Sequence, residues 1–250
     1  MSSASEHSVV ALVTAFNEQE TIGAVIDALR AAPSVARVHV VDDASTDETR
    51  AVALARGAEV TTLQTKLPVG EAIMAHLEAV TEETLLLWCD ADLVGLAPEH
   101  VEALIARYQR GDIVQSLSSR GALRSWPRAL RGRAVQAAWA WLFGPISGER
   151  VIRRSDFVAA IDLARSLGWS EMMRGYGIVL FLNWWAGAFG SGSAITYFDE
   201  LRQRQKFQKR GFGGFVAMAR QWAQFGLVWV KIRFNARRLR AAVQAETARA

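Results

Sequence analysis

The chain has 250 residues, and 51% of them are hydrophobic, which excludes disorder as the default and suits one large α/β domain or two small ones. A single cysteine, Cys89, excludes an internal disulfide, and its place in an apolar run indicates a buried, inert thiol in a reducing cytoplasm. Residues 1–8 lack a basic segment followed by a long apolar one, so we expect no secretory signal and a cytoplasmic protein.

The net charge of +4 hides two halves of opposite sign. Residues 1–119 contain 7 Lys and Arg against 18 Asp and Glu, whereas residues 120–250 contain 22 against 7. Residues 201–240 contain 11 basic residues, no acidic residue and several interleaved aromatic residues. Such a segment needs an anionic partner, which can be an anionic membrane surface, a nucleic acid or the acidic half of the same protein. Composition does not choose between these partners.

Strands and helices are expected to alternate through the first half of the chain. Apolar runs predict strands at residues 9–16, 35–41, 59–63, 84–89 and 113–116. Helical spacing predicts helices at residues 21–29, 70–80 and 98–110, and a further helix that Ser45 or Thr46 caps and that runs to residue 54. This alternation predicts a mainly parallel, doubly wound sheet with right-handed crossovers.

The regular alternation ends after residue 118. Residues 134–143 predict an apolar helix, and residues 144–154 predict a loop that leads into a short strand. Residues 175–198 contain no charge, which is long enough to consider a membrane span. Five glycines interrupt that stretch, so we expect a helix near residues 176–186 and a strand near residues 194–198 instead. Residues 214–240 predict one long amphipathic helix with basic and aromatic faces.

The most informative stretch is residues 85–92, an apolar run that ends in two carboxylates. Asp90 and Asp92 are two residues apart, so on an extended segment they point the same way, and the small Ala91 leaves room for a bulky ligand. Hard cations such as Mg²⁺ take carboxylate oxygens, keep several waters and complete their shell with a bound phosphate. The pair therefore indicates a divalent cation site, although two acids alone also suit a solvated strand end.

Three predicted strands end in polar groups: residues 14–18, 42–43 and 90–92. In a parallel sheet these ends converge on one edge, where ligands of open α/β sheets bind. A carboxylate there can accept a hydrogen bond from the imide N–H of uracil, and backbone groups near Ala15 can surround the base. A cation at Asp92 would then hold a diphosphate.

Five motifs in order carry a resemblance: ALVTAFNEQETI (11–22), VVDDASTDET (40–49), GEAI (70–73), LLLWCDADLVG (85–95) and SGERVIRR (147–154). They are similar to those of the family 2 glycosyltransferases of the GT-A fold, including relatives that make polyprenyl-phosphate sugars. The resemblance implies a Rossmann-like, mainly parallel sheet flanked by helices, with a mixed acceptor half and a C-terminal amphipathic helix. It divides the chain into a nucleotide-sugar-binding half (1–118), an acceptor-side half (119–213) and a basic helix (214–250).

The resemblance also implies roles for individual residues. Asp92 would bind the Mg²⁺ or Mn²⁺ ion and Asp90 the ribose or a metal-bound water, with both acting in catalysis beside Glu149. A UDP- or GDP-sugar would be held by a larger group: Thr14, Ala15, Phe16, Glu18, Asp43, Lys66, Gly70, Asp90 and Ala91. For Glu149 and its neighbour Arg150, an acceptor contact and a structural role stay equally open. The family resemblance also implies inversion at the anomeric carbon.

Three positions depart from the family pattern. Related sequences often have a lysine where this chain has Val69, so Lys66 or the metal would have to neutralise the diphosphate. Residues 175–177 read GYG, and Val179 stands at the fifth position of this segment, where relatives often have a glutamate. Only Gln203 or Gln205 is available where some relatives have a histidine that binds the metal.

Val179 cannot remove a proton from an alcohol, whereas a phosphate monoester acceptor needs no base. We therefore expect a phosphate-bearing acceptor, most simply polyprenyl phosphate at the inner face of a membrane that the protein binds peripherally. Cationic groups would hold the phosphate: Arg150, Arg153, Arg154, Arg202, Arg204, Lys206 and Lys209. Two apolar stretches, residues 176–189 and 207–215, would hold the lipid. The alternative is a sugar hydroxyl, with Glu149, Asp156 or Glu171 as the base.

Two other functions compete with sugar transfer. A sugar-phosphate nucleotidyltransferase needs a glycine-rich turn with an arginine after its first strand, which residues 14–18 lack. A nucleic-acid-binding protein could use the basic segment, but the acidic half argues against it, so no nucleic acid is expected. The four histidines fit no ligand spacing, and each is expected to be an ordinary surface or packed residue.

Overall fold

The computed structural model describes residues 9–82, 84–111, 113, 115–120, 149–188, 192–198, 201–203, 223, 226–235, 237 and 241. The elements of the first half are β1 (Val9–Ala15), α1 (Ile22–Ala31), β2 (Val35–Asp42), α2 (Thr49–Ala55), β3 (Glu59–Thr62), α3 (Val69–Ala79), β4 (Leu85–Asp90), β5 (Leu93–Val94), α4 (Pro98–Gln109) and β6 (Gln115–Arg120). Those of the second half are β7 (Arg150–Arg153), α6 (Arg154–Ser166), α7 (Ser170–Met173), α8 (Gly177–Ala188), β8 (Ser193–Phe198) and β9 (Arg202–Gln203). Residues 226–235 are also helical.

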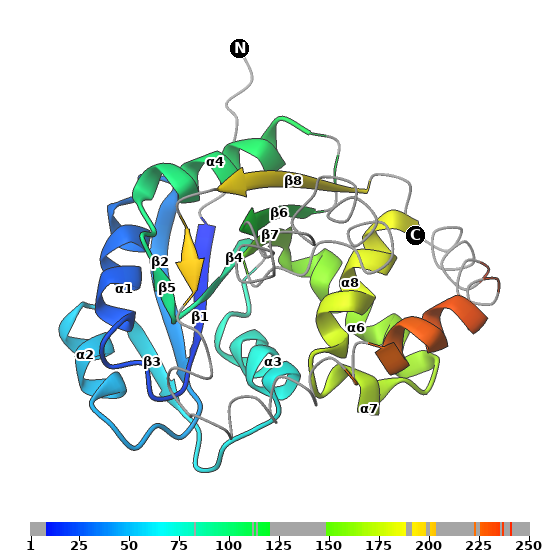
Figure 1. The fold of residues 1–250 in the computed structure, drawn as a ribbon, viewed down its shortest axis with the longest axis horizontal. Coiled ribbons are helices and arrows are strands. Elements are labelled where there is room, and N and C mark those ends of the chain that lie inside the picture. Colours follow the sequence, from blue (N-terminus) through cyan, green and yellow to red (C-terminus); the bar gives the residue numbers. More distant parts are fainter. Residues whose placement is uncertain are drawn as a thin grey trace, which may run out of the picture.

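Seven strands form one twisted sheet in the order β3-β2-β1-β4-β7-β6-β8 (Figure 1). The first four are parallel to one another, β7 is antiparallel to both β4 and β6, and β8 is parallel to β6. This mixed sheet flanked by helices confirms the predicted fold class. A separate ribbon pairs β5 with β9.

Alternate residues of the central strands face two different cores. On one face Ala11, Val13 and Cys89 pack with α1, α2 and α4. On the other face Leu12 and Trp88 pack with α3, α6 and α8. Because both faces are covered, the strands are apolar at successive positions, which is the pattern that made them recognisable.

The expected elements of the first half are confirmed, with shifted ends. α2 begins at Thr49 rather than at Ser45 or Thr46, and the fifth expected strand begins at Gln115 rather than at residue 113. In the second half α8 and β8 replace the considered membrane span, as expected, whereas α6, α7, β5 and β9 were not predicted. The predicted helix at 134–143 lies outside the described residues, as does most of the predicted helix at 214–240.

None of the helices in the described part of the chain is both long enough and apolar enough to cross a bilayer.

Candidate active site

The three acid-bearing strand ends meet where the strand order reverses. β1 lies between β2 and β4, and Thr14 pairs with Val41 on one side and with Asp90 on the other. On one side β1 connects through α1 to β2, whereas the chain reaches β4 on the other side of β1 from β3 through α3. In open α/β sheets such a point is where a ligand crevice is expected, beyond the carboxyl ends of the strands. The predicted convergence of residues 14–18, 42–43 and 90–92 is therefore confirmed.

The loops after β1 and β2 are held in unusual backbone conformations. Asn17 has φ of 55° and Ala44 has φ of 59°, and no other non-glycine residue in the described ranges has a positive φ. The two loops are tied together, because the Asn17 N–H donates to Ser45 Oγ at 3.0 Å and the Thr46 N–H donates to Asn17 Oδ1 at 2.8 Å. Ser45 and Thr46 thus join the loops instead of capping α2, which corrects the sequence expectation. Strain that surrounding bonds maintain is typical of ligand sites.

Asp43, Lys66 and Phe16 form a compact cluster above β1 and β2. Lys66 Nζ lies 2.8 Å from Asp43 Oδ2 and 3.4 Å from the centre of the Phe16 ring. The other carboxylate oxygen of Asp43 accepts the Leu67 N–H at 2.7 Å, and Asp43 is only 4% exposed. The carboxylate therefore fixes the loop that carries Lys66, and it places a cation and an aromatic face beside each other at the crevice.

Glu18 lies in the loop that joins β1 to α1. Its backbone N–H donates to Thr49 Oγ1 at 2.7 Å, and its carboxylate accepts the Thr21 hydroxyl at 3.2 Å. These bonds support the loop between β1 and α1, which also carries Phe16 of that cluster.

The stretch that the sequence predicts to bind a metal is bent rather than extended. β4 ends at Asp90, and Ala91 and Asp92 lie in a turn, so the prediction that both carboxylates alternate along one strand is wrong. Asp90 is half-buried, whereas Asp92 is buried at 8% exposure. No group of three or more His, Cys, Asp or Glu side chains in the described ranges could hold a metal by itself. A cation held here would need oxygen ligands from a phosphate and from water.

The ribbon of β5 and β9 brings the chain back to this turn. Leu93 pairs with Gln203, and Val94 pairs with Arg202, one and two residues after Asp92. Arg202 is exposed. Strands of two residues show no periodicity, so the sequence offered no signal for this contact. The other proposed cations of this segment, Arg204, Lys206 and Lys209, and also Gln205, lie outside the described residues.

Glu149 and Arg150 lie inside the protein beside β4. Arg150 pairs with Trp88 and is fully buried, and Glu149 is 2% exposed. Burial lowers the pKa of Arg150 to about 9, although the negative charges of Glu149 and Asp90 raise it, so the guanidinium stays protonated at neutral pH. It also donates to Gln115 Oε1 at 3.0 Å. The structure thus favours the structural role for Arg150 over an acceptor contact.

Two other arginines of the SGERVIRR motif lie at the wrong edge of the sheet for acceptor binding. Arg153 pairs with Leu85 at the start of β4, and Arg154 donates to the carbonyls of Val80 and Leu77 at the end of α3. β7 runs antiparallel to β4, so the motif leads away from Asp90. Neither arginine therefore lies at the edge of the sheet where Asp90 lies, which corrects the expectation that they bind the acceptor.

The absence of a side chain at Gly70 allows the start of α3 to pack against the backbone of residues 173–175. Its N–H donates to the Arg174 carbonyl at 2.8 Å, and the Glu71 N–H donates to the same oxygen at 3.2 Å, so these donors of α3 already have a partner. A Cβ at Gly70 would lie 1.9 Å from the Met173 carbonyl oxygen. This packing role accounts for the glycine, and its predicted contact to the donor stays a prediction.

We expect Gly70→Ala to lower the free energy of unfolding by about 1–3 kcal/mol or more, because the backbone of residues 173–175 must move. Urea denaturation measures the change. Gly187→Ala in α8 is the matched control, because no atom lies within 4 Å of its added Cβ. Equal stability of the two variants would contradict the close approach.

The residue at the family's glutamate position is part of the core. Val179 is buried in α8 among the residues that pack on β4 and α6. Of the alternative bases, Asp156 lies in the first turn of α6 and Glu171 is exposed and paired with Arg174. Of the three candidate bases, Glu149 lies beside β4, the strand that ends at Asp90.

His39 and His76 form a buried polar chain behind the crevice. Their Nδ1 atoms are 2.8 Å apart, His76 Nε2 lies 3.2 Å from the Thr14 hydroxyl, and His39 Nε2 lies 3.0 Å from that of Thr61. Both are therefore packed histidines, as expected. Burial, and then the neighbouring His39, lower the pKa of His76 well below its ordinary value. The pKa of His39 is also lowered, chiefly by burial and further by Arg37, while Glu59 opposes this.

Because these pKa values are lower in the folded than in the unfolded protein, acid favours unfolding. Stability should be constant above the unfolded value of about 6.5 and should fall below it, by at most about 1.4 kcal/mol per pH unit for each proton. Urea denaturation between about pH 7.5 and 5.5 measures this slope. In His76→Gln we expect a shallower slope, and identical slopes in both proteins would show that the pair does not titrate on unfolding.

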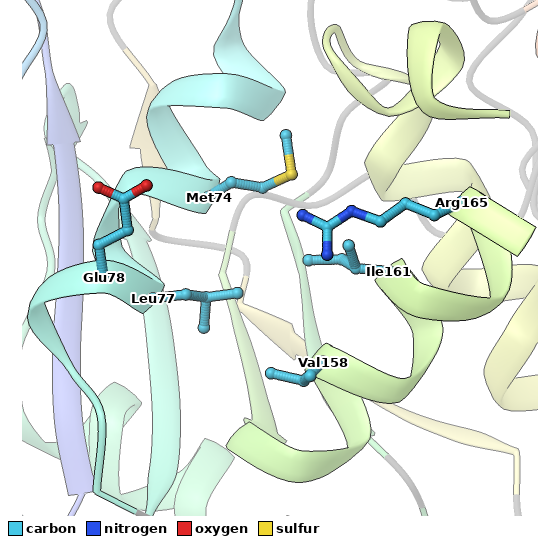
Figure 2. Close-up of a pocket in the computed structure, with 6 residues that line it drawn as sticks. All are labelled: Met74, Leu77, Glu78, Val158, Ile161 and Arg165. Carbon is cyan, nitrogen blue, oxygen red and sulfur yellow. The ribbon is translucent and has the colours of Figure 1, made fainter.

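A cavity of about 200 Å³ lies between α3 and α6, away from the strand ends (Figure 2). Met74, Leu77, Val158 and Ile161 line it, Arg165 reaches into the gap, and Glu78 points away from it. None of the predicted site residues lines this cavity, so it is not the proposed donor site.

Comparison with known protein families finds a family model that matches this chain. The sequence profile described as glycosyl transferase family 2 matches residues 10–159, which is more than half of the chain. Two curated relatives are glucosyl-3-phosphoglycerate synthases: that of Mycolicibacterium smegmatis is 32% identical over 106 residues (39% of this chain), and that of Mycolicibacterium paratuberculosis is 32% identical over 117 residues (43% of this chain). The chain spans about a third (35%) of the length of either relative.

Solved structures share the fold. Glucosyl-3-phosphoglycerate synthase from Mycobacterium tuberculosis, in complex with Mn²⁺, uridine diphosphate and glucosyl-3-phosphoglycerate, aligns with a TM-score of 0.67 at 24% identity over 89% of this chain and 80% of that chain. The complex of that enzyme with Mn²⁺, uridine-diphosphate-glucose and glycerol 3-phosphate gives the same TM-score at 23% identity and the same coverage. A third structure of that enzyme contains Mg²⁺ and uridine diphosphate, with a TM-score of 0.64 at 23% identity over 88% of this chain and 80% of that chain.

Proposed function

Because the chain belongs to glycosyl transferase family 2, we propose that it transfers a sugar from a nucleoside diphosphate donor to a phosphate-bearing acceptor at the crevice beyond β1, β2 and β4. One observation carries this proposal: the cluster of Asp43, Lys66 and Phe16 and the turn of Asp90 and Asp92 flank the point where the strand order reverses. The groups that we propose for donor binding and the carboxylates that we propose for metal binding thus lie on either side of the strand-order reversal.

The nucleoside would bind over the ends of β1 and β2. The carboxylate of Asp43 would accept a hydrogen bond from a base N–H, and Phe16 would supply an aromatic face. The backbone of Thr14 and Ala15 would frame the pocket, and Glu18 would support the loop through its bond from the Thr21 hydroxyl. Lys66 already compensates the charge of Asp43, and its side chain is 46% exposed, so it can turn toward a donor phosphate. Uridine diphosphate is our preferred donor portion, because it is the nucleotide in the complexes of the related synthase.

Asp92 and Asp90 would hold Mg²⁺ or Mn²⁺, the ions that accompany uridine diphosphate in the related synthase. Two carboxylates at a bent strand end suit a hard cation that completes its shell with a diphosphate and water. When bound, the metal supplies Lewis acidity for the leaving diphosphate. The small Ala91 between the two carboxylates would leave room for the ligand.

The acceptor would carry a phosphate. Val179 is in the core and offers no base, whereas the exposed Arg202 is brought to the Asp92 turn by the β5–β9 ribbon. Phosphoglyceric acid and glycerol 3-phosphate occupy complexes of the related synthase, and both are phosphate monoesters. A small phosphorylated acid is thus our first candidate. Attack by its ionised phosphate oxygen would need no base, whereas attack by a hydroxyl, of this molecule or of a sugar, would release a proton to the predicted base Glu149.

A second candidate acceptor is a lipid phosphate such as polyprenyl phosphate, used by a protein bound peripherally to the inner face of a membrane. The observation that favours it is the exposed apolar side of the helix at residues 226–235. Inversion at the anomeric carbon also stays a prediction for either acceptor.

A matrix of donors and acceptors tests the function. UDP- and GDP-sugars would each be incubated with Mn²⁺ and with 3-phosphoglycerate, glycerol 3-phosphate, undecaprenyl phosphate or unphosphorylated sugars. We expect product only with a phosphate-bearing acceptor, and NMR of the product gives its anomeric configuration. Transfer only to unphosphorylated sugars that is lost in Glu149→Gln would reject the phosphate acceptor.

For Asp43→Ala we expect donor binding to weaken by about 1–3 kcal/mol, because the variant loses a charge-assisted contact and releases the loop of Lys66 and Leu67. Calorimetry with uridine diphosphate measures the affinity. Asp27→Ala on the exposed side of α1 is the control. Unchanged affinity in Asp43→Ala would remove Asp43 from the donor pocket.

A further inference from the structure

The helix at residues 226–235 has apolar side chains on two opposite sides. Val228 and Ile232 point inward, where they are 4% and 8% exposed and join the core of α6 and α8. Val228 lies against the start of α8, since one of its methyl groups is 3.0 Å from the position of a Cβ on Gly177. The helix is therefore docked on the protein body, at the end of the molecule away from α1 and α2 (Figure 1).

The opposite side of this helix is apolar and exposed. Leu227, Val230 and Phe234 are 70%, 43% and 87% exposed, and their spacing of three and four residues places them on one stripe. Among the described residues only two other large hydrophobic side chains are exposed, Leu54 and Val94, and each lies on a different element. The concentration of three on one helix is a patch of the kind that marks an interaction surface.

The charged side chains described on this helix are all positive. Lys231, Arg233 and Arg237 are exposed, and residues 201–240 contain no acidic side chain. Arg233 also lies 5.3 Å from the ring centre of Trp229. Two copies of the protein that met through this stripe would bring like charges together, which opposes association. An anionic lipid surface satisfies both features, because its headgroups attract the basic residues and its acyl region accepts the apolar side chains.

We propose that Leu227, Val230 and Phe234, flanked by Lys231, Arg233 and Arg237, form a docking surface for an anionic lipid bilayer. Val228 and Ile232 hold the helix on the body, so the outward stripe meets the bilayer with the helix lying parallel to it. Lipid binding at this surface deepens the membrane part of the proposed function. It requires no sugar transfer, so the two can fail independently.

Vesicle cosedimentation of the full chain tests the surface. We expect binding to vesicles of phosphatidylglycerol mixed with phosphatidylcholine, weaker binding at high salt, and little binding to phosphatidylcholine alone. Leu227→Ser with Phe234→Ser should weaken binding at least about tenfold, because two apolar side chains no longer enter the bilayer. Lys231→Gln with Arg233→Gln should weaken it by about fivefold for each charge and reduce the salt dependence.

Leu54→Ser is the matched control, since Leu54 is an exposed leucine on α2, and it should bind vesicles as the unchanged protein does. Circular dichroism and calorimetry with uridine diphosphate on every variant separate a lost surface from a lost fold or donor site. Absence of binding to anionic vesicles, or full binding by Leu227→Ser with Phe234→Ser, would overturn the proposal. So would a dimer in light scattering that this variant dissociates, because the stripe would then be covered by a second copy.

Discussion

Asp92→Asn is expected to lower metal-dependent sugar transfer by at least about a hundredfold while leaving the fold intact. A metal that stabilises the leaving diphosphate lowers the barrier by several kcal/mol, and an amide oxygen is a far weaker ligand than a carboxylate. Asp92 is buried at 8% exposure in the turn after β4, and a nearly isosteric amide preserves its packing. Initial rates across a Mn²⁺ titration measure the effect.

Asp162→Asn is the control, since this carboxylate of α6 is 60% exposed and forms a surface pair with Arg165. It should retain full activity, because such pairs contribute little to stability. Thermal unfolding of both variants without metal checks that the fold is kept. If Asp92→Asn keeps the rate and the Mn²⁺ affinity of the unchanged protein, the metal is held by other residues or takes no part.

The parallel half of the fold could be predicted because each central strand is apolar at successive positions and ends in polar residues. Val13 and Cys89 are buried within β1 and β4, and the acids follow where those strands end. Parallel strands then bring those ends together whatever their spacing in the sequence. The helix α6 was missed although Phe157, Ile161 and Ala164 recur at helical spacing, and that signal could have identified it.

The acceptor side could not be predicted, because a sequence does not give the direction of a strand in a mixed sheet. Had β7 run parallel to β4, Arg153 and Arg154 would have followed the same edge as Asp90. Its antiparallel direction places them at the start of β4 and turns Arg150 inward opposite Trp88. The turn at Ala91 and Asp92 was missed for a related reason, since an acid after a strand is compatible with either an extended or a bent backbone.

Arg150→Met should lower the free energy of unfolding by about 3–5 kcal/mol, because removal of one partner leaves buried negative charge uncompensated. Arg150 is fully buried, and Glu149 and Asp90 both act on it electrostatically. It also donates to Gln115, which in turn donates to Ser193 Oγ at 2.8 Å and to Asn183 Oδ1 at 3.2 Å. One guanidinium therefore connects β7 and β6 to α8 and β8, and its loss breaks a buried network.

A double-mutant cycle separates charge from packing. If Glu149 is the main partner, Glu149→Leu with Arg150→Met should be less destabilised than the sum of the two single variants, because no buried charge of that pair remains. Arg165→Met, at an arginine that is 61% exposed, should change stability by less than about 0.5 kcal/mol. Urea denaturation gives all four values. A loss below about 1 kcal/mol in Arg150→Met would mean that water reaches this part of the sheet, and Arg150 would then be available to an acceptor phosphate after all.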